Sequence, residues 1–563
     1  MNTVDRLKLL AHIVRWRLTW SRHDSAYKPP NLASAKFISA HEAAARIPDH
    51  AAVLSCGMAG NARCSTFFWA IRERFEREAA PRGLTWMNVG AQGGRGKVPG
   101  TVEELALPGL LSRYITGHME TAKALLRLAE DGQLALYTLP QGQMSLLLAA
   151  QGRGEETLRT VTGLNTFLDP RVGRGAAVSP GAENEFIEAD GDHLIYRMPK
   201  VDICLFNAPF ADAEGNIYFK HAATITENVQ GAQAARRNGG LVMAVVSAVV
   251  PKDPAAISMP ANEVDSIVVN PTNEQTGSVQ QRRYWPMFTV GSKVPERDAV
   301  ERLKFVNHVL KITPVRGPVE NALARLAARL FVRVVPKGGI VNIGVGFPEE
   351  VCRLVIEQGL GSNYTFTTET GVYGGLPAPG IFFGAAINPT RMEPSSWMFE
   401  LYRDRLDVAV LGFLQVDSQG NVNVSKRGPR MLDYVGPGGF PDIAAGAKTL
   451  IFVGSWMAHA RFSLREGRLT IEQPGTPKFV AHVDEITLSG KEALRLGKQV
   501  YYVTNIGVFQ LATSGLTLIE VMPGIDVQRD ILQLVPGQIQ LPADGQVPIT
   551  DPAVLTGRDF TMA

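Results

Sequence analysis

The sequence has few cysteines, little excess charge and no long apolar run, and each shortage excludes a class of protein. Its 4 cysteines are too few for a disulfide-based fold, and none forms the C-x-x-C pair typical of structural zinc sites. Lysine and arginine number 57 against 54 acidic residues, and a net charge of +3 is too small to drive nucleic-acid binding. The longest apolar run, Leu241 to Val250, falls short of the roughly 20 residues that span a membrane, so we predict a buried strand there and no membrane span.

The remaining composition is that of a globular protein with many tight loops. Hydrophobic residues make up 45% and charged residues 20% of the chain, with 55 glycines and 35 prolines. At about 150 residues per domain, a chain of 563 residues indicates several domains.

The first 36 residues form a basic extension with helical periodicity. No small-residue cleavage site follows it, so it does not read as a secretory signal, and we expect a cytoplasmic protein. We expect an amphipathic helix that docks on the body or on another subunit; loose attachment to a membrane surface is a lesser alternative. The apolar residues at helical spacing are Val4, Leu7, Leu10, Val14 and Leu18.

The chain contains the same unit twice. The segment VDICLFNAPFADAEGNIYF, from Val201, aligns without a gap with LDVAVLGFLQVDSQGNVNV, from Leu406. Each copy predicts a buried strand, a D-x-x-G-N turn and a second short strand. A second pair, AAVLSCGMAG from Ala51 and GGIVNIGVG from Gly338, predicts a strand that runs into a glycine loop, with a helical segment on each side. We therefore expect two related halves.

Both halves alternate short apolar strands with helical segments, a pattern that predicts α/β domains with largely parallel sheets flanked by helices. We assign residues 1–36 to the extension, 37–271 to a first domain and 317–540 to a second. Residues 272–316 form a linker that includes a helical segment, and residues 541–563 form a tail that we expect to be exposed.

The second half contains the clearest candidate site. A strand at residues 340–343 leads into the loop Gly344-Val345-Gly346, whose backbone N–H groups can approach a ligand at a helix N-terminus. Glu349 stands where a dinucleotide-binding G-x-G-x-x-G fingerprint needs its third glycine, which argues against a nicotinamide site. Glu369 follows the next strand and enters a glycine-rich loop, where ligand sites of α/β sheets form. From these residues alone, a turn-capping role for Glu369 is equally open.

Several further segments give the chain a family resemblance. The motifs ETGVYGGLPAPG, FFGAAINP, GNVNVSK, GPGGFPDI and MPGIDVQRDIL, together with LPQG, NTFLDPR, ADAEGNI and AQAARRNGGLV in the first half, resemble the family I coenzyme A transferases. The similarity runs in order over about residues 37 to 540 and is strongest to the single-chain propionate and 3-oxoacid types, in which two α/β subunits are fused.

The resemblance implies a function and a set of site residues. Glu369 matches the family's nucleophile, which exchanges coenzyme A between an acyl-CoA and a free carboxylic acid by ping-pong chemistry through a glutamyl-CoA thioester. Coenzyme A is then a substrate, no tightly bound cofactor or metal is required, and a homo-oligomer, dimer or tetramer, is expected. The implied oxyanion and coenzyme A contacts are Gly344, Val345, Gly346, Gly438, Gly439 and, more loosely, Lys448. The implied substrate pocket comprises Gln141, Gly374, Gly375, Asn388, Tyr402 and Arg403.

One segment departs from the family pattern. Propionate-type members carry a glycine-rich loop before the second hairpin, where this chain has Arg403-Asp404-Arg405. We expect this loop to border the acyl pocket and to favour a larger or dicarboxylic acid; alternatively, the arginines pair with Asp404 at the surface. Two other functions stay open: an acyl-CoA hydrolase, if water reaches the glutamyl thioester, and a non-catalytic protein that keeps the fold.

Overall fold

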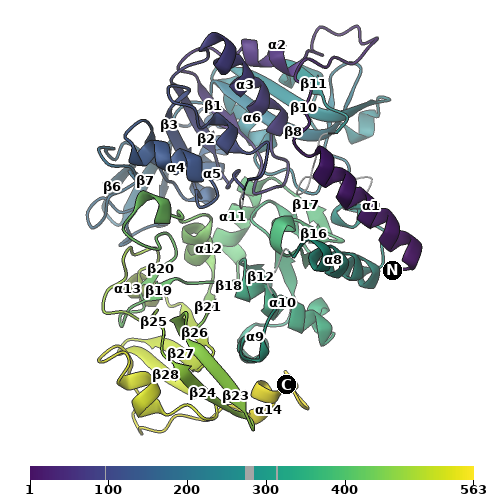
Figure 1. The fold of residues 1–563 in the computed structure, drawn as a ribbon. Helices are drawn as coiled ribbons and strands as arrows, with labels where there is room; N and C mark the ends of the chain where they lie inside the picture. The colour runs from purple at the N-terminus through teal and green to yellow at the C-terminus, as the bar shows by residue number, and fades with distance from the viewer. Residues whose placement is uncertain (95–96, 273–284, 312–314, 563) are drawn as a thin grey trace.

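The computed structural model describes residues 1–94, 97–272, 285–311 and 315–562. Figure 1 shows two α/β units in contact, one from the first half of the chain (purple to teal) and one from the second half (green to yellow). Each unit is built on a sheet whose central strands run parallel, so the predicted fold class is confirmed. Within these ranges no helix is long and apolar enough to cross a bilayer.

The sheet of the first half has the order β11-β10-β8-β1-β2-β3-β4, with parallel pairing throughout, and β9 pairs antiparallel with β8. Its central strands are apolar because helices cover them; β8 is buried along its whole length. The strands are β1 (Ala52–Ser55), β2 (Leu84–Asn88), β3 (Leu111–Thr116), β4 (Ala135–Tyr137), β8 (Ile203–Asp212), β9 (Ile217–Tyr218), β10 (Leu241–Val250) and β11 (Ser266–Val269). The helices are α2 (Ala40–Ala45), α3 (Ser65–Glu78), α4 (Lys123–Glu130), α5 (Gln141–Arg153) and α6 (Asn228–Arg237). A small antiparallel sheet of β5 (Thr157–Thr160), β6 (Ile187–Asp190) and β7 (His193–Arg197) is inserted before β8.

The sheet of the second half has the order β17-β14-β13-β12-β18-β21-β26-β27-β28. The five strands from β13 to β26 run parallel, and antiparallel strands extend both edges. The strands are β12 (Ile340–Ile343), β13 (Thr365–Thr367), β14 (Val372–Tyr373), β17 (Arg391–Met392), β18 (Val408–Leu411), β21 (Thr449–Val453), β26 (Gln499–Thr504), β27 (Gly507–Ala512) and β28 (Gly515–Val521). The helices are α9 (Pro318–Val334), α10 (Phe347–Glu357), α11 (Ser395–Arg405), α12 (Phe440–Gly446), α13 (Gly490–Arg495) and α14 (Pro552–Thr556).

The two D-x-x-G-N turns have the same hydrogen bonds. Asn216 donates from Nδ2 to Asp212 over 2.8 Å, and Asn421 donates in the same way to Asp417 over 2.9 Å. In both turns the aspartate also accepts the backbone N–H of the asparagine. The first turn joins β8 to β9, and the second joins β19 (Gln415–Val416) to β20 (Val422–Asn423). The repeated sequence therefore builds the same local structure twice.

The N-terminal extension and the linker pack on one another. Helix α1 (Thr3–Thr19) lies at the outer margin of the molecule beside α8 (Glu296–Leu310), as Figure 1 shows. One face of α1 buries Leu9 and Ile13 in a cluster with Leu303 and Val306 of α8 and with Phe288. The expected helix and its docking on the body are therefore present. The remaining parts of the expected linker, residues 273–284 and 312–314, lie outside the described residues.

Most of the C-terminal tail is exposed, as expected, but α14 anchors it: Val554 and Leu555 are buried, and their carbonyls accept hydrogen bonds from Arg325 of α9. One sequence expectation is wrong. Residues 402–405 do not form a loop but the last turn of α11. Tyr402 and Phe399 anchor that helix in the core, which fixes the backbone of the turn.

Candidate active site

The sheet of the second half changes its direction of winding at β12. The chain passes from β12 through α10 to β13, and then returns through α11 to β18 on the other side of β12. Right-handed crossovers place the two helices on opposite faces, and in open α/β sheets the ligand crevice forms at such a switch point, beyond the carboxyl ends of the strands, here β12 and β18. Gly344 and Gly412 follow these two strands, and a side chain at Gly412 would meet nothing within 4 Å.

Glu369 lies at this edge of the sheet, directly after β13, and only 7% of it is exposed. The neighbouring Thr368 and Thr370 point away from it and donate hydrogen bonds to the carbonyl of Gly384. The alternation of side chains therefore turns Glu369 toward the face that carries α11. The next residue but one, Gly371, has a φ of +104°, and a side chain there would collide with the carbonyl oxygen of Glu393. Only glycine permits this tight turn.

A chain of polar side chains holds the carboxylate of Glu369. Asn342 of β12 donates from Nδ2 to Oε2 of Glu369 over 3.4 Å and to the hydroxyl of Tyr402 over 3.0 Å. The Tyr402 hydroxyl in turn donates to Thr367 over 3.0 Å. Burial raises the pKa of Glu369 above its ordinary value, and the hydrogen bond from Asn342 partly offsets this.

The first half closes over this region through the N-terminus of α5. The backbone N–H of Gln141 donates to the carbonyl of Gly438 over 3.0 Å, and Gly438 donates to the carbonyl of Gly117 over 2.7 Å. Oε1 of Gln141 lies 3.3 Å from the position that a Cβ atom would take at Gly439. Phe399 of α11 packs against the same glycine and against Tyr402, which links this contact to the Asn342 chain.

Comparison with known proteins agrees with this architecture. A family model described as coenzyme A transferase matches residues 38–270. The chain is 34% identical to the caffeate CoA-transferase of Acetobacterium woodii over 88% of this chain and 93% of that protein. It is 32% identical to the acetate CoA-transferase YdiF of Escherichia coli K12 over 90% of this chain and 93% of that protein.

The chain belongs to the coenzyme A transferase family. It is therefore an enzyme that transfers coenzyme A. Solved structures agree: the acyl-CoA transferase YdiF of Escherichia coli O157:H7 matches as apoenzyme with a TM-score of 0.79 and 28% identity, over 95% of this chain and 99% of that one. The thioester complex of YdiF with CoA matches with a TM-score of 0.80 and 28% identity, over 94% and 98% of the two chains.

Some of the predicted oxyanion donors of this transferase are already engaged within the fold. The N–H of Gly344 donates to Val410 over 2.8 Å, and that of Gly438 donates to Gly117. The N–H of Gly346 faces the buried carboxyl of Glu349, whose pKa burial raises to about 7. Among the residues that the structure describes, the N–H groups of Val345 and Gly439 donate to none, which leaves them available to a ligand.

The remaining predicted pocket residues follow β14 or belong to α11. Gly374 and Gly375 form the turn after β14, and Gly375 packs on the backbone of Asn388, whose amide side chain donates to the carbonyl of Val294 over 2.9 Å. These three residues shape the chain segment that follows Glu369. Arg403 points to the surface, where it pairs with Asp404 over 2.8 Å. Tyr402 is fully buried behind Asn342, so it supports the site without lining an open pocket.

Lys448 is at the wrong edge of the sheet for a coenzyme A contact. It precedes β21, whereas Glu369 follows β13, and these strands run in the same direction. Its ammonium pairs with Asp407, which precedes β18, over 2.8 Å. A residue that directly precedes a strand lies at the amino end of that strand. Lys448 is therefore at the end of the parallel strands opposite to Glu369.

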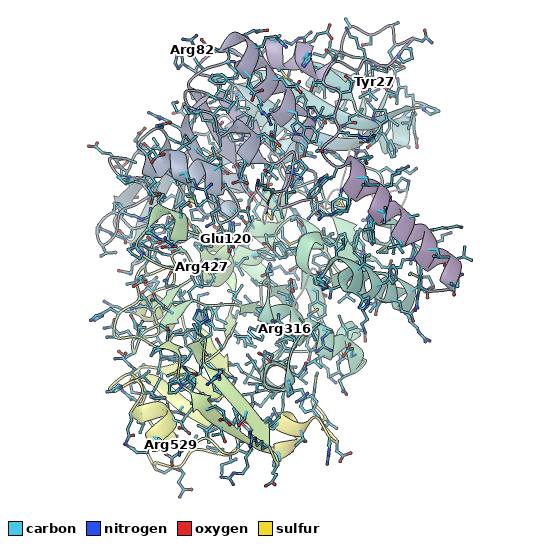
Figure 2. All side chains as sticks on the ribbon, viewed as in Figure 1. Tyr27, Arg82, Glu120, Arg316, Arg427 and Arg529 are labelled. Carbon is cyan, nitrogen blue, oxygen red and sulfur yellow. The ribbon has the colours of Figure 1, made fainter. Side chains whose placement is uncertain are left out.

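A different lysine lies at the edge that carries Glu369. Lys478 donates to the carbonyl of Phe413, two residues beyond the end of β18, over 3.2 Å. Burial and the charge of Arg427 lower the pKa of Lys478 to about 8. Figure 2 shows Arg427 of the second half facing Glu120 of the first half where the two halves meet, and their side chains are 2.6 Å apart. A polar region therefore lies beside Lys478 where the two halves meet.

Sequence reasoning missed Asn342, Asp442 and Lys478. A signal existed for Asn342, because it is the one polar residue in the otherwise apolar strand IVNI. The carboxyl of Asp442 accepts the backbone N–H of Gly142 over 2.8 Å. Asp442 stands in the motif GPGGFPDI and Gly142 in LPQG, but nothing in the sequence pairs the two. Lys478 lies far from any motif, and only the tertiary structure brings it to the crevice.

Proposed function

We propose that this enzyme exchanges coenzyme A between an acyl-CoA and a free carboxylate through a covalent intermediate on Glu369. The observation that carries the proposal is the position of Glu369: a buried carboxylate, held by Asn342, at the carboxyl edge of the parallel sheet, beside its switch point. Membership of the coenzyme A transferase family adds to it.

The reaction begins when the Glu369 carboxylate attacks the thioester carbonyl of the acyl-CoA. The carbon–sulfur bond breaks, and an acyl-glutamyl anhydride and CoA thiolate form. The thiolate then attacks the glutamyl carbonyl, which releases the first acid as its carboxylate and leaves a glutamyl-CoA thioester. An acceptor carboxylate reverses these two steps and departs as the new acyl-CoA. Covalent catalysis of this kind produces ping-pong kinetics.

The surroundings of Glu369 suit both roles that it plays. As a nucleophile it must be ionised, and the N–H of Asn342 favours the charged form. Burial has the opposite effect on the pKa but strips water from the carboxylate and keeps water from the thioester. The same burial favours transfer to a carboxylate over hydrolysis.

Each attack creates a tetrahedral oxyanion that needs donors. We assign this role to the N–H groups of Val345 and Gly439, which have no partner among the described residues. Loss of one good oxyanion donor costs about 2.7–4 kcal/mol in other enzymes. Gly439 is also the N-cap of α12, so the helix dipole adds positive potential at this point.

We further propose that Lys478 binds coenzyme A. Its ammonium lies at the carboxyl edge of the sheet beside Phe413, in reach of a molecule seated over Gly412. A half-buried ammonium with no carboxylate partner among the described residues gains most from an anionic phosphate or a pantetheine carbonyl.

An exchange assay tests the proposed function against hydrolysis. Acetyl-CoA is incubated with the enzyme alone and with propionate, butyrate, succinate or caffeate as acceptor, and both CoA and new acyl-CoA are quantified. We expect new acyl-CoA only with an acceptor and parallel lines in double-reciprocal plots. Release of CoA at the same rate without any acceptor would instead identify a hydrolase, and the absence of both reactions would point to a non-catalytic protein.

A further inference from the structure

Helix α1 has two apolar faces, and the protein covers only one of them. The inner face packs Leu9 and Ile13 against α8. The outer face leaves large side chains in water, and the exposed fractions are 57% for Val4, 61% for Leu7, 37% for Leu10, 49% for Val14 and 72% for Leu18. With Ala11, which is also exposed, they recur at intervals of three and four residues, so they form one continuous stripe.

Cations border this stripe on both sides. Lys8 and Arg15 follow Val4 and Ala11 by four residues each and lie along one border of the stripe. Arg6 and Arg17 lie along the other border, four residues before and seven residues after Leu10. The acidic residue of α1, Asp5, is half-buried on the inner side. The exposed half of the helix is therefore apolar along its centre and positively charged along both margins.

The charge pattern selects the occupant of this face. A second copy of α1, in either orientation, would set lysine and arginine against lysine and arginine along both margins of the contact, which opposes pairing. An anionic lipid surface complements the same pattern, because acyl chains accept the apolar stripe while headgroup phosphates accept the cations. The outward position of α1 at the margin of the molecule leaves this face accessible to a flat surface (Figure 1).

We infer that α1 docks this coenzyme A transferase on an anionic membrane surface, with the apolar stripe of Val4, Leu7, Leu10, Ala11, Val14 and Leu18 inserted at the headgroup boundary. The inner face stays on α8 throughout, so docking needs no unfolding of the helix. This inference does not depend on the chemistry of Glu369, because α1 lies outside the crevice.

Vesicle flotation with the full-length enzyme tests the inference. We expect flotation with vesicles of phosphatidylglycerol and phosphatidylcholine, none with phosphatidylcholine alone, and a decrease at high salt, where charges are screened. The double variant Leu7→Ser/Leu18→Ser should lose flotation. Lys8→Gln/Arg15→Gln should bind about thirtyfold more weakly, at about 1 kcal/mol for each cation near an anionic surface.

A matched control removes exposed apolar residues elsewhere. Val172 and Ile549 are 65% and 70% exposed, so Val172→Ser/Ile549→Ser changes the surface by a similar amount and should float like the wild type. Unchanged exchange activity and thermal unfolding show that each variant is folded. Equal flotation with neutral vesicles, or no flotation at all, would overturn the inference. A drop in molecular mass of Leu7→Ser/Leu18→Ser by light scattering would also overturn it, because the occupant would then be a second copy.

Discussion

The Asp442 side chain of the second half accepts a hydrogen bond from the backbone N–H of Gly142 in the first half, over 2.8 Å. Its other oxygen accepts from Nε2 of Gln143 over 2.7 Å. A side chain at Gly142 would collide with this carboxyl, so the approach requires glycine. The same turn of α5 presents Gln141 to Gly438. Asp442 therefore fixes the register between the two halves beside the proposed oxyanion donor Gly439.

A reciprocal contact lies at the start of α11. Ser395 donates its backbone N–H to the carbonyl of Thr226 over 2.9 Å and its hydroxyl to the carboxyl of Glu227 over 3.4 Å. The helices α5 and α11 occupy corresponding places in the two halves: α5 is the last helix before β8 and α11 the last before β18 and β19, and β8 and β19 each lead into a D-x-x-G-N turn. Each half thus offers one buried carboxyl to the first turn of the other half's helix.

The Asp442 contact makes stability depend on pH. Burial raises the pKa of Asp442 to about 7, so the folded chain holds this proton more tightly than the unfolded chain. The resulting stability is complete below the unfolded pKa of about 3.9 and is lost as pH rises through about 7. Between pH 6 and pH 8 the loss of this contribution lowers the free energy of unfolding of the wild type by about 1.4 kcal/mol.

We expect Asp442→Asn to reduce that difference, measured by urea unfolding at both pH values. The exposed Asp404→Asn is the control, and an identical pH difference in the Asp442 variant would contradict the account.

Asn342 should control the ionisation of Glu369. Replacing Asn342 by leucine removes the donor that favours the charged carboxylate, so the pKa of Glu369 rises further. We expect the acid limb of kcat/KM to move to higher pH, with a larger loss of activity at pH 6 than at pH 8. Tyr402→Phe keeps the packing but removes the hydroxyl that accepts from Asn342, and should shift the limb less. An unshifted acid limb in the leucine variant would separate Asn342 from the chemistry.

Lys478 and Lys448 form a matched pair. Lys478→Met should raise KM for acyl-CoA by about tenfold or more, because a charge-assisted hydrogen bond contributes about 1.5–3 kcal/mol. Lys448→Met should leave KM unchanged, since its ammonium pairs with Asp407 at the opposite edge of the sheet. Steady-state kinetics with varied acyl-CoA at saturating acceptor measure both. The reverse pattern would restore Lys448 as the coenzyme A contact.

Arg403 should have no influence on acyl selectivity. It is 63% exposed and pairs with its neighbour Asp404 on the outer surface of α11. We expect Arg403→Ser to leave the ratio of kcat/KM for propionate and succinate within about twofold of wild type, as is usual for surface substitutions. A selectivity change of fivefold or more would bring back the view that this segment borders the acyl pocket.

Local sequence signals predicted much of the fold. They also predicted the part of the site that lies in a single contiguous motif, the one around Glu369. The strand at Leu241–Val250, the glycine loop at Gly344 and the repeated turns are determined by apolar runs and by glycine and aspartate chemistry, so they were readable in advance. Glu369 stands after a strand, and its family motif is contiguous. Contacts between segments distant in sequence could not be predicted, because Asp442 and Gly142 of the two halves, and Lys478 and Phe413 within the second half, are brought together only by packing. The segment at Arg403 was misjudged because the buried Tyr402 continues α11 through it.

The most direct test of the central claim is mass spectrometry of the enzyme after brief incubation with acetyl-CoA and no acceptor, followed by acid quench and proteolysis at low pH. The account predicts that the peptide containing Glu369 gains the mass of coenzyme A less one water, that added acetate removes the adduct, and that Glu369→Ala carries none. An unmodified Glu369 peptide from an enzyme that still exchanges coenzyme A at the normal rate would contradict it.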